Sequence, residues 1–456
     1  MANEGTRFVA PGAWVQGGWA NDVLLVVDAN GRWSEVRADA PAAALAGATR
    51  LAGPVVPGLV NAHSHAFQRA IAGLTERSES PDDDFWSWRD RMYSAANRVT
   101  PGQLEAIAAF LYAELLQAGY THVCEFHYLH NDIDGAAYAD PMEMSLAIVR
   151  AARRTGIGLT LLPTLYMRQG FAARGLREDQ RRFSSTPASV MRVASEIRDR
   201  EAGSGLITAG VALHSIRAVG KEAMAEVAGA ATGMPVHIHI AEQRREIEDC
   251  VAEHGLRPIA WLLAHASVDS RWNLVHATHA TAAELEGVRE KGAAIVLCPA
   301  TEGNLGDGLF DLPSWLGLSG NWSVGSDSHV TRSWQEELRL LEYSQRFHLR
   351  RRNVAASAAL SVSSAAALFE GALRGGTAAA GMQLGGIAMG QRADFAVIDM
   401  DSPALAGVPP SHLLDALVFS SPDARLRNVH VAGRPVPALD ADVRSAFVAA
   451  MRSLWG

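Results

Sequence analysis

Residues 57–76 read PGLVNAHSHAFQRAIAGLTE, an apolar run that ends in two histidines and continues into a helix-like pattern. In an extended strand the side chains alternate between two faces, so His63 and His65 point the same way. Two imidazoles at a strand end fill an apolar core poorly, whereas imidazoles are common ligands of metal ions. The stretch therefore predicts a buried strand whose end carries part of a metal site.

The same alternation of an apolar run with an Ala-, Leu-, Glu- and Arg-rich helical stretch recurs along the middle of the chain. The candidate strands lie at 56–65, 122–128, 158–166, 207–215, 235–242, 273–279, 293–301 and 322–329. Helical patterns such as PGQLEAIAAFLYAELLQAG (101–119) and MEMSLAIVRAARRTG (142–156) separate them. Strand–helix alternation predicts a parallel sheet, and about eight such units predict an α/β fold, a closed (β/α)8 TIM barrel.

The two ends of the chain have a different, β-rich texture. Residues up to about 56 contain short strand patterns and the hairpin signal DANGRW (28–33), in which Asn-Gly separates two apolar alternations. Strand patterns return in GGIAMGQRADFAVIDMD (385–401) and ARLRNVHVAGRPV (424–436). We expect 1–56 and 377–456 to form one small discontinuous β-sandwich domain with a C-terminal helix, and 57–376 to form the catalytic barrel.

Composition excludes several classes of protein. The 456 residues are 48% hydrophobic and 20% charged, which is typical of a folded globular protein. A net charge of −8 offers no basic footprint for nucleic acid or an anionic membrane. The three cysteines lie far apart, so no disulfide framework is predicted. The N-terminus lacks a signal-peptide pattern and no uncharged run reaches transmembrane length, so we expect a cytoplasmic location.

Polar side chains follow several of the predicted strands, where barrels of this kind build their active sites. The first strand ends in His63 and His65, and the others contribute His239, Glu242, His276 and Asp327. Three imidazoles and one carboxylate from this set would bind one divalent ion and leave room for water. Zinc is the expected ion, with iron or manganese as alternatives, because nitrogen and oxygen ligands discriminate weakly among them. Taken singly, these residues are also typical of packed histidines and a capping aspartate.

The stretches GLVNAHSH, HIHIAE, LVHATH and GSDSH together resemble the amidohydrolase superfamily, specifically its mononuclear-metal deaminase branch. The resemblance covers essentially the whole chain and implies a barrel with a β-rich domain built from both termini. Dinuclear members usually bridge their metals with a carboxylated lysine at the end of the fourth strand. Here that strand reads GVALHSIR (210–217) and has no lysine, so we expect a single metal ion.

The resemblance also implies a role for each polar residue. It assigns metal binding to His63, His65, His239 and Asp327. It implies that Asp327 accepts a proton from the attacking water, and that His276 orients this water and stabilises the tetrahedral centre. Glu242 would then carry the proton to the nitrogen that leaves as ammonia, since a departing amine must be protonated.

Further stretches resemble one family within that branch, the N-formimino-L-glutamate deiminases of histidine degradation. They are FWSWRDRMY (85–93), CEFHYLHND (124–132), ALHSIRAV (212–219) and LCPATEGNLGDGLFDL (297–312). The resemblance implies hydrolysis of N-formimino-L-glutamate to N-formyl-L-glutamate and ammonia. The substrate contacts that it implies are Gln68, Arg89, Tyr128, His214 and Arg217. Two arginines suit a dicarboxylate because guanidinium groups bind carboxylates bidentately. We expect Arg89 in an aromatic loop, and TEGNLGDG (301–308) in a loop after the seventh strand.

Two other functions remain open at this point. A deaminase of the same branch that acts on a guanine-like heterocycle or another amidine would favour aromatic stacking over two arginine anchors. A non-catalytic barrel would lack metal ligands, yet every expected ligand is present. The expected partners are a small dicarboxylate amidine and a second copy of the chain in a homodimer, with neither nucleic acid nor membrane.

Overall fold

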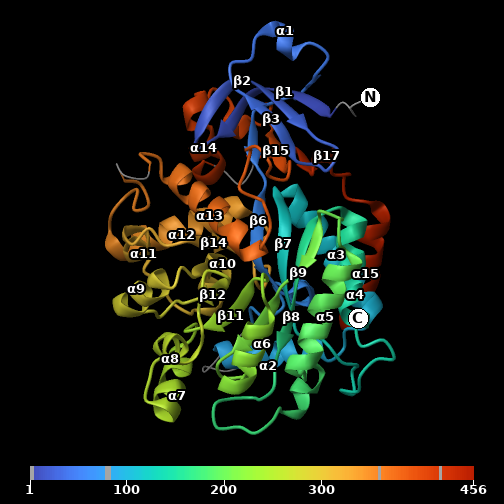
Figure 1. Cartoon of the computed structure of the whole chain (residues 1–456), viewed down its shortest axis with the longest axis vertical. Coiled ribbons are helices and arrows are strands. Elements are labelled where there is room, and N and C mark those ends of the chain that lie inside the picture. The colour runs from blue at the N-terminus through green and yellow to red at the C-terminus, as the bar shows by residue number, and fades with distance from the viewer. Residues whose placement is uncertain (1–4, 78–83, 358–360, 421–423) are drawn as a thin grey trace.

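The computed structural model describes residues 5–77, 84–357, 361–420 and 424–456. These residues form a barrel with surrounding helices and a smaller β-rich unit at one end of it (Figure 1). Within the described ranges, no helix is both long enough and apolar enough to cross a membrane.

The barrel strands are parallel and follow one another in chain order. They are β6 (Leu59–Ser64), β7 (Tyr120–His127), β8 (Gly158–Leu165), β9 (Ile207–Ala209), β10 (Val211–Ser215), β11 (Val236–Ile240), β12 (Trp272–His276), β13 (Ala294–Leu297) and β14 (Trp322–Val324). Both β9 and β10 pair with β8, so the nine strands of the sheet fill eight positions. The predicted barrel is confirmed.

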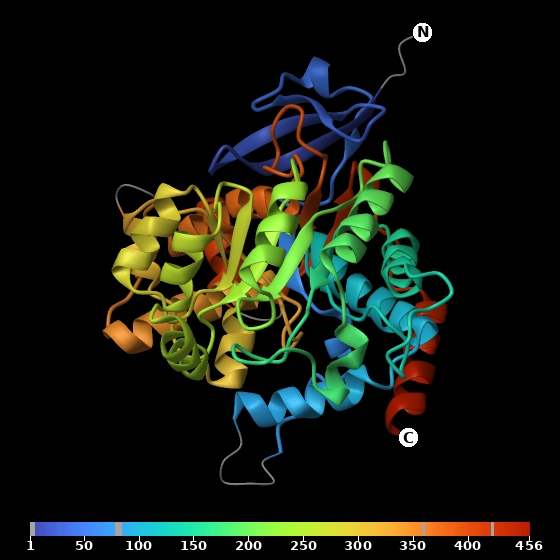
Figure 2. The ribbon, with the colours of Figure 1, turned by 60° about the horizontal axis from the view of Figure 1, so that its bottom comes forward.

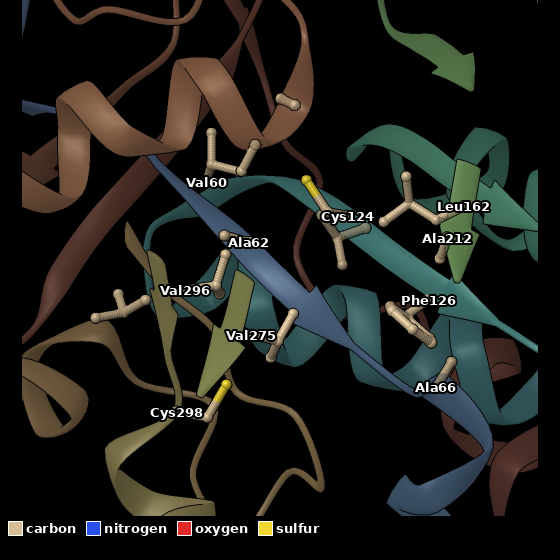
Figure 3. Close-up of a cluster of buried hydrophobic side chains, with 14 of the residues drawn as sticks. Val60, Ala62, Ala66, Cys124, Phe126, Leu162, Ala212, Val275, Val296 and Cys298 are labelled. Atoms are coloured by element: carbon tan, nitrogen blue, oxygen red, sulfur yellow. The ribbon is translucent and has the colours of Figure 1, made fainter. Parts of the chain in front are cut away.

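Small and branched apolar side chains pack the barrel wall. Figure 3 shows part of this core, with Val60 and Ala62 of β6, Cys124 of β7, Leu162 of β8 and Val296 of β13, all of them buried. The cysteines of the chain are buried and free. Because protein interiors are packed as densely as organic crystals, such a wall holds the strand ends in place.

The barrel closes between β6 and the segment that follows β14. The Asp327 N–H donates to the His63 carbonyl at 3.0 Å, and the His65 N–H donates to the Asp327 carbonyl at 3.3 Å. The Asn61 side chain donates to the Ser326 hydroxyl at 2.7 Å and accepts from the Ser326 N–H at 2.9 Å. Barrel closure therefore places Asp327 beside the two histidines of the first strand.

Helices cover the outside of the barrel. The two predicted from the sequence are confirmed as α3 (Pro101–Gln117) and α4 (Glu143–Thr155). A capping box from Thr100 to Gln103 and a proline at the first position start α3. The others are α5 (Pro187–Arg200), α6 (Lys221–Ala230), α7 (Arg244–His254), α8 (Pro258–His265), α9 (Ala282–Glu290), α11 (Leu312–Gly317), α12 (Trp334–Leu349) and α13 (Ser364–Ala380), with short 3-10 turns at η1 (Ala66–Ala70) and η2 (Glu178–Phe183).

Two segments expected as loops contain helices instead, α2 (Phe85–Ala96) and α10 (Pro299–Leu305). The Asp84 side chain accepts from the backbone N–H groups of Trp86 and Ser87, and the Ser87 hydroxyl accepts from the Asp84 N–H. This capping box satisfies the first free donors of α2. The expected loop position of Arg89 was therefore wrong, and the residue projects from a helix.

Glycines allow α13 to lie directly against the closure of the barrel. A Cβ atom on Gly375 would lie 1.8 Å from the Trp322 carbonyl oxygen of β14, and one on Gly376 would lie 2.9 Å from the Val60 Cβ of β6. Real Cβ atoms do not approach other atoms this closely, so neither position accommodates a side chain without movement of the barrel wall.

Replacing Gly375 with alanine should destabilise the protein by about 1–3 kcal/mol, because the added methyl must displace the Trp322 backbone. Chemical denaturation of the variant beside the wild type measures this. Gly229 of α6 is the matched control, since a Cβ there meets nothing within 4 Å. Gly229→Ala should be neutral or stabilising by up to about 1 kcal/mol. Equal stability of the two variants would contradict the close packing of α13.

Strands from both chain ends form the smaller unit. They are β1 (Thr6–Val15), β2 (Gly18–Val27), β3 (Trp33–Arg37), β4 (Thr49–Arg50), β5 (Val55–Pro57), β15 (Phe395–Ile398), β16 (Leu426–Val431) and β17 (Arg434–Pro435). The sheet order is β17-β16-β15-β5-β1-β2-β3, with β4 beside β1, and β2 and β3 form the predicted hairpin. The short helices α1 (Ala42–Leu45), η3 (Pro403–Leu405), η4 (Pro410–His412) and α14 (Leu413–Phe419) complete the connections.

This sheet folds over onto itself around an apolar core. The Trp33 ring of β3 lies 5.6 Å from the Phe395 ring of β15. In a flat sheet these strands, which are separated by β2, β1 and β5, would lie about 19 Å apart. Phe8 of β1 also packs on Phe395, at 5.5 Å. The unit therefore has the two facing layers of the expected sandwich.

Two features bear on the expected domain boundaries. Helix α13 runs from Ser364 to Ala380, so a boundary at 376–377 would cut a helix of the barrel. The C-terminal helix α15 (Ala441–Trp455) packs on α3, with Phe447 stacked on Phe110 at 4.1 Å and Trp455 donating to the Ala70 carbonyl. We propose that the small unit comprises 1–56 and 381–440, and that α15 belongs to the barrel.

Candidate active site and metal centre

The carboxyl ends of the barrel strands open into a cavity lined by polar and aromatic side chains. Figure 2 turns this end of the barrel toward the viewer, with α2 at the lower edge of the view. Of the site residues predicted from the sequence, His63 is fully buried and the rest line the cavity. The lining residues of that set are His65, Gln68, Arg89, Tyr128, His214, Arg217, His239, Glu242, His276 and Asp327.

The predicted metal ligands converge on one another. His63 Nε2 lies 3.1 Å from His65 Nε2 and 3.0 Å from His239 Nε2. Asp327 Oδ1 lies 3.5 Å from the Nε2 atoms of His63 and His65. Among the described residues, His63, His65 and Asp327 form one triad able to hold an ion, and His63, His239 and His276 form another. The two triads share His63, which places it at the centre of the cluster.

The hydrogen bonds made by the Nδ1 atoms of His65 and His239 determine whether their Nε2 atoms carry a proton or a lone pair. His65 Nδ1 donates to the Phe126 carbonyl at 2.9 Å, and His239 Nδ1 donates to the His214 carbonyl at 3.0 Å. A carbonyl only accepts, so each Nδ1 carries the proton and each Nε2 of a neutral ring presents a lone pair. Lone pairs and a carboxylate this close repel one another unless a cation lies between them. The donor set therefore fits a divalent ion such as zinc.

Burial keeps these histidines neutral. It lowers the pKa of His63 to about 3, and it also lowers the pKa values of His65 and His239. Burial alone would raise the pKa of Asp327, but the hydrogen bond to His63 and the positive charge of His276 hold that pKa below its usual range. Neutral imidazoles and an ionised carboxylate are the protonation states that metal binding requires.

His276 and two glutamates form a second polar group beside the cluster. His276 Nε2 lies 3.6 Å from Glu242 Oε1 and 3.9 Å from Asp327 Oδ2, while its Nδ1 lies 3.4 Å from Glu302 Oε1. Burial favours the neutral ring, but the three carboxylates outweigh it and raise the pKa of His276 to about 10. Burial raises the pKa of Glu242 to about 7, against the charges of His276 and Arg217. A carboxyl group that exchanges protons near neutral pH is suited to proton transfer.

The cavity also contains two guanidinium groups, Arg89 on α2 and Arg217 just after β10. Among the described residues, neither has a side-chain hydrogen bond or an ion pair within 4 Å, and the Nε of each is buried without a partner. Gln68 donates to the Tyr128 hydroxyl at 3.1 Å, which leaves its buried carbonyl oxygen unpartnered. Burial, with the charge of Arg217, lowers the pKa of His214 and keeps it neutral. This part of the cavity therefore offers donors to an anionic ligand.

The model of the amidohydrolase family matches residues 55–436 of the chain. The chain belongs to the amidohydrolase family. It is 47% identical over 420 residues to the formimidoylglutamate deiminase of Pseudomonas aeruginosa, which covers 91% of each chain. A 5-methylthioadenosine/S-adenosylhomocysteine deaminase of Halobacterium salinarum is 29% identical over 356 residues, or 78% of this chain and 75% of the relative.

Solved structures agree with this assignment. A crystal structure of an amidohydrolase from Brucella melitensis has 40% sequence identity and a TM-score of 0.93, covering 99% of this chain and 100% of that one. An adenosine deaminase from Xanthomonas campestris with bound zinc has 23% identity and a TM-score of 0.79, covering 99% and 97%. The latter likeness concerns the fold alone. The resemblance inferred from the sequence is confirmed at the level of the family and the fold.

Two carboxylates of this amidohydrolase site are not among the predicted residues. Glu125 of β7 accepts from the Ser64 hydroxyl at 2.7 Å and from the Ala66 N–H at 2.6 Å, so it braces the chain on both sides of His65. Glu302 of α10 faces His276 and accepts from the Cys298 N–H at 2.9 Å. Glu125 could have been predicted as a site residue, because it is a lone carboxylate within the apolar strand HVCEFHY. No comparable sequence pattern distinguished Glu302.

Two tyrosines of the cavity wall also lie outside the prediction. The hydroxyl groups of Tyr93 and Tyr166 lie 3.2 Å apart, and the Gln180 side-chain amide donates to both, at 3.1 and 3.0 Å. These residues lie on α2, just after β8 and on η2. No local pattern relates positions so far apart in the sequence, and only the folded chain brings them together.

The backbone of the amidohydrolase is strained where the site residues leave their strands. Positive φ angles occur at Ala241 (54°), His276 (69°), Ala277 (50°), Asp327 (46°) and His329 (64°). Non-glycine residues rarely adopt this left-handed conformation, which costs about 1–3 kcal/mol each. These turns lie just after β11, at the end of β12 and a few residues after β14, so they set the direction in which His276 and Asp327 enter the cavity.

Two further strand-end histidines support the scaffold. His237 Nε2 bonds to the Ala379 carbonyl of α13 at 2.9 Å. His329 lies buried between the Ser326 hydroxyl, at 2.9 Å, and the His65 carbonyl, at 3.1 Å. Neither ring belongs to the metal-ligand cluster, and each ties a strand end to its neighbours.

Proposed function

We propose that this amidohydrolase is a metal-dependent formimidoylglutamate deiminase, which hydrolyses N-formimino-L-glutamate to N-formyl-L-glutamate and ammonia in histidine degradation. The observation that carries the proposal is one cavity that holds both the metal-ligand cluster and two guanidinium groups without a partner. The 47% identity to the Pseudomonas aeruginosa formimidoylglutamate deiminase supports the same activity. The reaction is hydrolysis of a carbon–nitrogen bond.

The two arginines explain the choice of a dicarboxylate substrate. N-formimino-L-glutamate carries two carboxylates, and each would pair with one guanidinium group, Arg89 or Arg217. Gln68, Tyr128 and His214 complete the substrate contacts in this proposal. A neutral heterocycle such as guanine would leave the donors of both guanidinium groups without an anionic partner in the cavity. The free arginines therefore favour the dicarboxylate over the heterocycle.

One divalent metal ion fits the cluster. His63, His65, His239 and Asp327 would hold it, and their nitrogen and oxygen atoms suit zinc first, with iron or manganese as alternatives. When bound, the ion supplies Lewis acidity that makes a coordinated water acidic near neutral pH. Strand β10, which contains His214, carries no lysine to bridge a second ion, and this supports a single metal.

The side chains move the protons of the reaction. Asp327 accepts a proton from the attacking water. As it does so, the oxygen of the water bonds to the formimino carbon, and the C=N electron pair moves to the nitrogen. His276 donates a hydrogen bond to the developing tetrahedral centre. Glu242, 3.6 Å from His276, delivers the proton to the departing nitrogen. As the C–N bond breaks, the nitrogen takes a second proton, the one held by Asp327, while the hydroxyl of the tetrahedral centre becomes a carbonyl and returns its proton to Glu242. Ammonia leaves, the formyl group remains on glutamate, and both carboxyl groups regain their starting states.

Ammonia release from N-formimino-L-glutamate tests substrate and metal together. We expect the zinc-loaded protein to release ammonia, to stop after chelation, and to resume when zinc is restored. Guanine should release none. If the zinc-loaded protein releases ammonia from guanine alone, the heterocycle deaminase is correct, and if it releases none from either compound, the substrate is a different amidine.

Two expectations from the sequence stay predictions. The homodimer is testable by light scattering of the purified protein at several concentrations. The cytoplasmic location is testable by fractionation of cells that express the chain with its native termini.

A further inference from the structure

Three arginines surround a single tryptophan at the edge of the candidate site. Trp86 lies on the first turn of α2, and the Cζ atom of Arg89, one turn further along the same helix, is 4.4 Å from the centre of its indole ring. The Cζ of Arg217 is 5.5 Å from that ring, and the Cζ of Arg245, at the start of α7, is 4.9 Å from it. The tryptophan thus joins α2 to the segments that follow β10 and β11.

Trp86 replaces the carboxylate partners that such arginines usually have. Among the described residues, no acidic group lies within 4 Å of the guanidinium group of Arg89 or Arg217, and both carry a buried Nε without a partner. Two like charges that share a cavity repel each other. The indole face attracts both cations through its quadrupole, and tryptophan does so better than tyrosine or phenylalanine.

The geometry of this attraction leaves the donors of the arginines free. The indole ring attracts a guanidinium group without accepting a conventional hydrogen bond from its N–H groups, whereas a carboxylate partner would occupy those N–H groups. The Nε–H groups of Arg89 and Arg217 are in fact without a partner. Contact with Trp86 therefore restrains the two guanidinium groups and leaves donors available to a ligand.

We infer that Trp86 is a positioning residue that pre-orients Arg89 and Arg217 for the two carboxylates of the substrate. The inference rests on the proposed function. Because Trp86 does not line the cavity, it acts through the arginines and touches no reacting atom. Its contribution should thus appear in substrate binding, with little effect on the chemical step.

Steady-state kinetics with N-formimino-L-glutamate test the inference. Trp86→Leu keeps apolar volume but removes the ring, so KM should rise about tenfold or more while kcat stays within about threefold. Trp86→Phe restores a ring face and should bring KM back to within about threefold of the wild-type value. Trp19→Leu is the matched control, because Trp19 is a half-buried tryptophan in the small unit. It should leave both constants unchanged.

Each outcome has a separate meaning. Wild-type protein that releases no ammonia from this substrate overturns the proposed function and this inference with it. Active wild-type protein with an unchanged KM in Trp86→Leu overturns the inference alone. The inference also fails if Trp86→Leu lowers kcat as strongly as it raises KM, or if Trp86→Phe does not restore KM, because a merely structural role predicts both results.

Discussion

Asp327→Asn should lower kcat by at least about 10³-fold, because the same carboxylate serves as a metal ligand and as the base that accepts the proton of water. The substitution preserves shape, since the backbone of Asp327 is held by hydrogen bonds to His63 and His65 on the neighbouring strand. It removes the negative charge and the basic oxygen. The measurement is kcat for ammonia release, together with metal analysis of the purified variant.

A surface aspartate provides the control for this change. Asp401 of the small unit is exposed and pairs only with Arg427 among the described ion pairs, far along the chain from the catalytic strand ends. Asp401→Asn should retain the wild-type kcat and metal content. An Asp327→Asn variant that keeps its metal and more than about a tenth of the wild-type kcat would show that another group takes the proton.

Glu242→Gln should lower kcat by about 10²–10⁴-fold while the metal content stays at the wild-type level. Glu242 is not a member of the metal-ligand cluster, so its loss leaves those ligands in place. Glutamine keeps the size of the side chain but carries no transferable carboxyl proton, so the departing nitrogen would leave unprotonated. Steady-state kinetics and metal analysis of the variant measure both quantities.

Glu248 offers a matched substitution on a nearby helix. It lies on α7, six residues after Glu242, and its side chain is exposed. Glu248→Gln should leave kcat unchanged. If Glu242→Gln also lost its metal, the loss of activity would no longer report on proton transfer. A kcat within about tenfold of the wild type would remove Glu242 from the proposed mechanism.

Comparison of Asp327→Asn with Glu242→Gln separates metal binding from proton transfer. Asp327 lies 3.5 Å from two histidines of the cluster, so its replacement disturbs metal binding and proton transfer together. Among the described ion pairs, Glu242 is linked to the cluster through His276, which lies 3.6 Å from it and 3.9 Å from Asp327. A kcat loss with retained metal at Glu242, and a kcat loss with weaker metal binding at Asp327, would together support the proposed division of labour.

Local patterns predicted the parts of the site that lie at strand ends. Period-two alternation placed His63 and His65 on one face, and the rule that barrel enzymes act at the carboxyl ends of their strands placed Asp327 near them. Local patterns also contained a signal that the loop prediction overlooked. The sequence DFWS (84–87) has a capping aspartate followed three residues later by a serine, and this box starts the helix that carries Arg89.

Other features depend on contacts between distant parts of the chain. The amphipathic pattern of α15 predicts a helix but does not specify its neighbour, and the folded chain stacks Phe447 on Phe110 of α3 rather than on the small sheet. The proposed shift of the boundary from residue 376 to residue 380 depends on a similar contact. Glycines at 375 and 376 mark the closest approach of α13 to the barrel, and that contact exists only when β14 and β6 are already side by side.

The sequence by itself determined the class of fold, the approximate positions of the barrel strands along the chain and the residue types at their ends, because these follow from periodicity within short segments. Only the tertiary structure decided which of those residues meet. Barrel closure brings Asp327 to His63, the pairing of β6 with β7 brings Glu125 to the turn at His65, and the packing of α2 over the strand ends brings Trp86 to Arg217. Each pair joins segments that are far apart in the chain, so their meeting depends on the packing of the whole barrel.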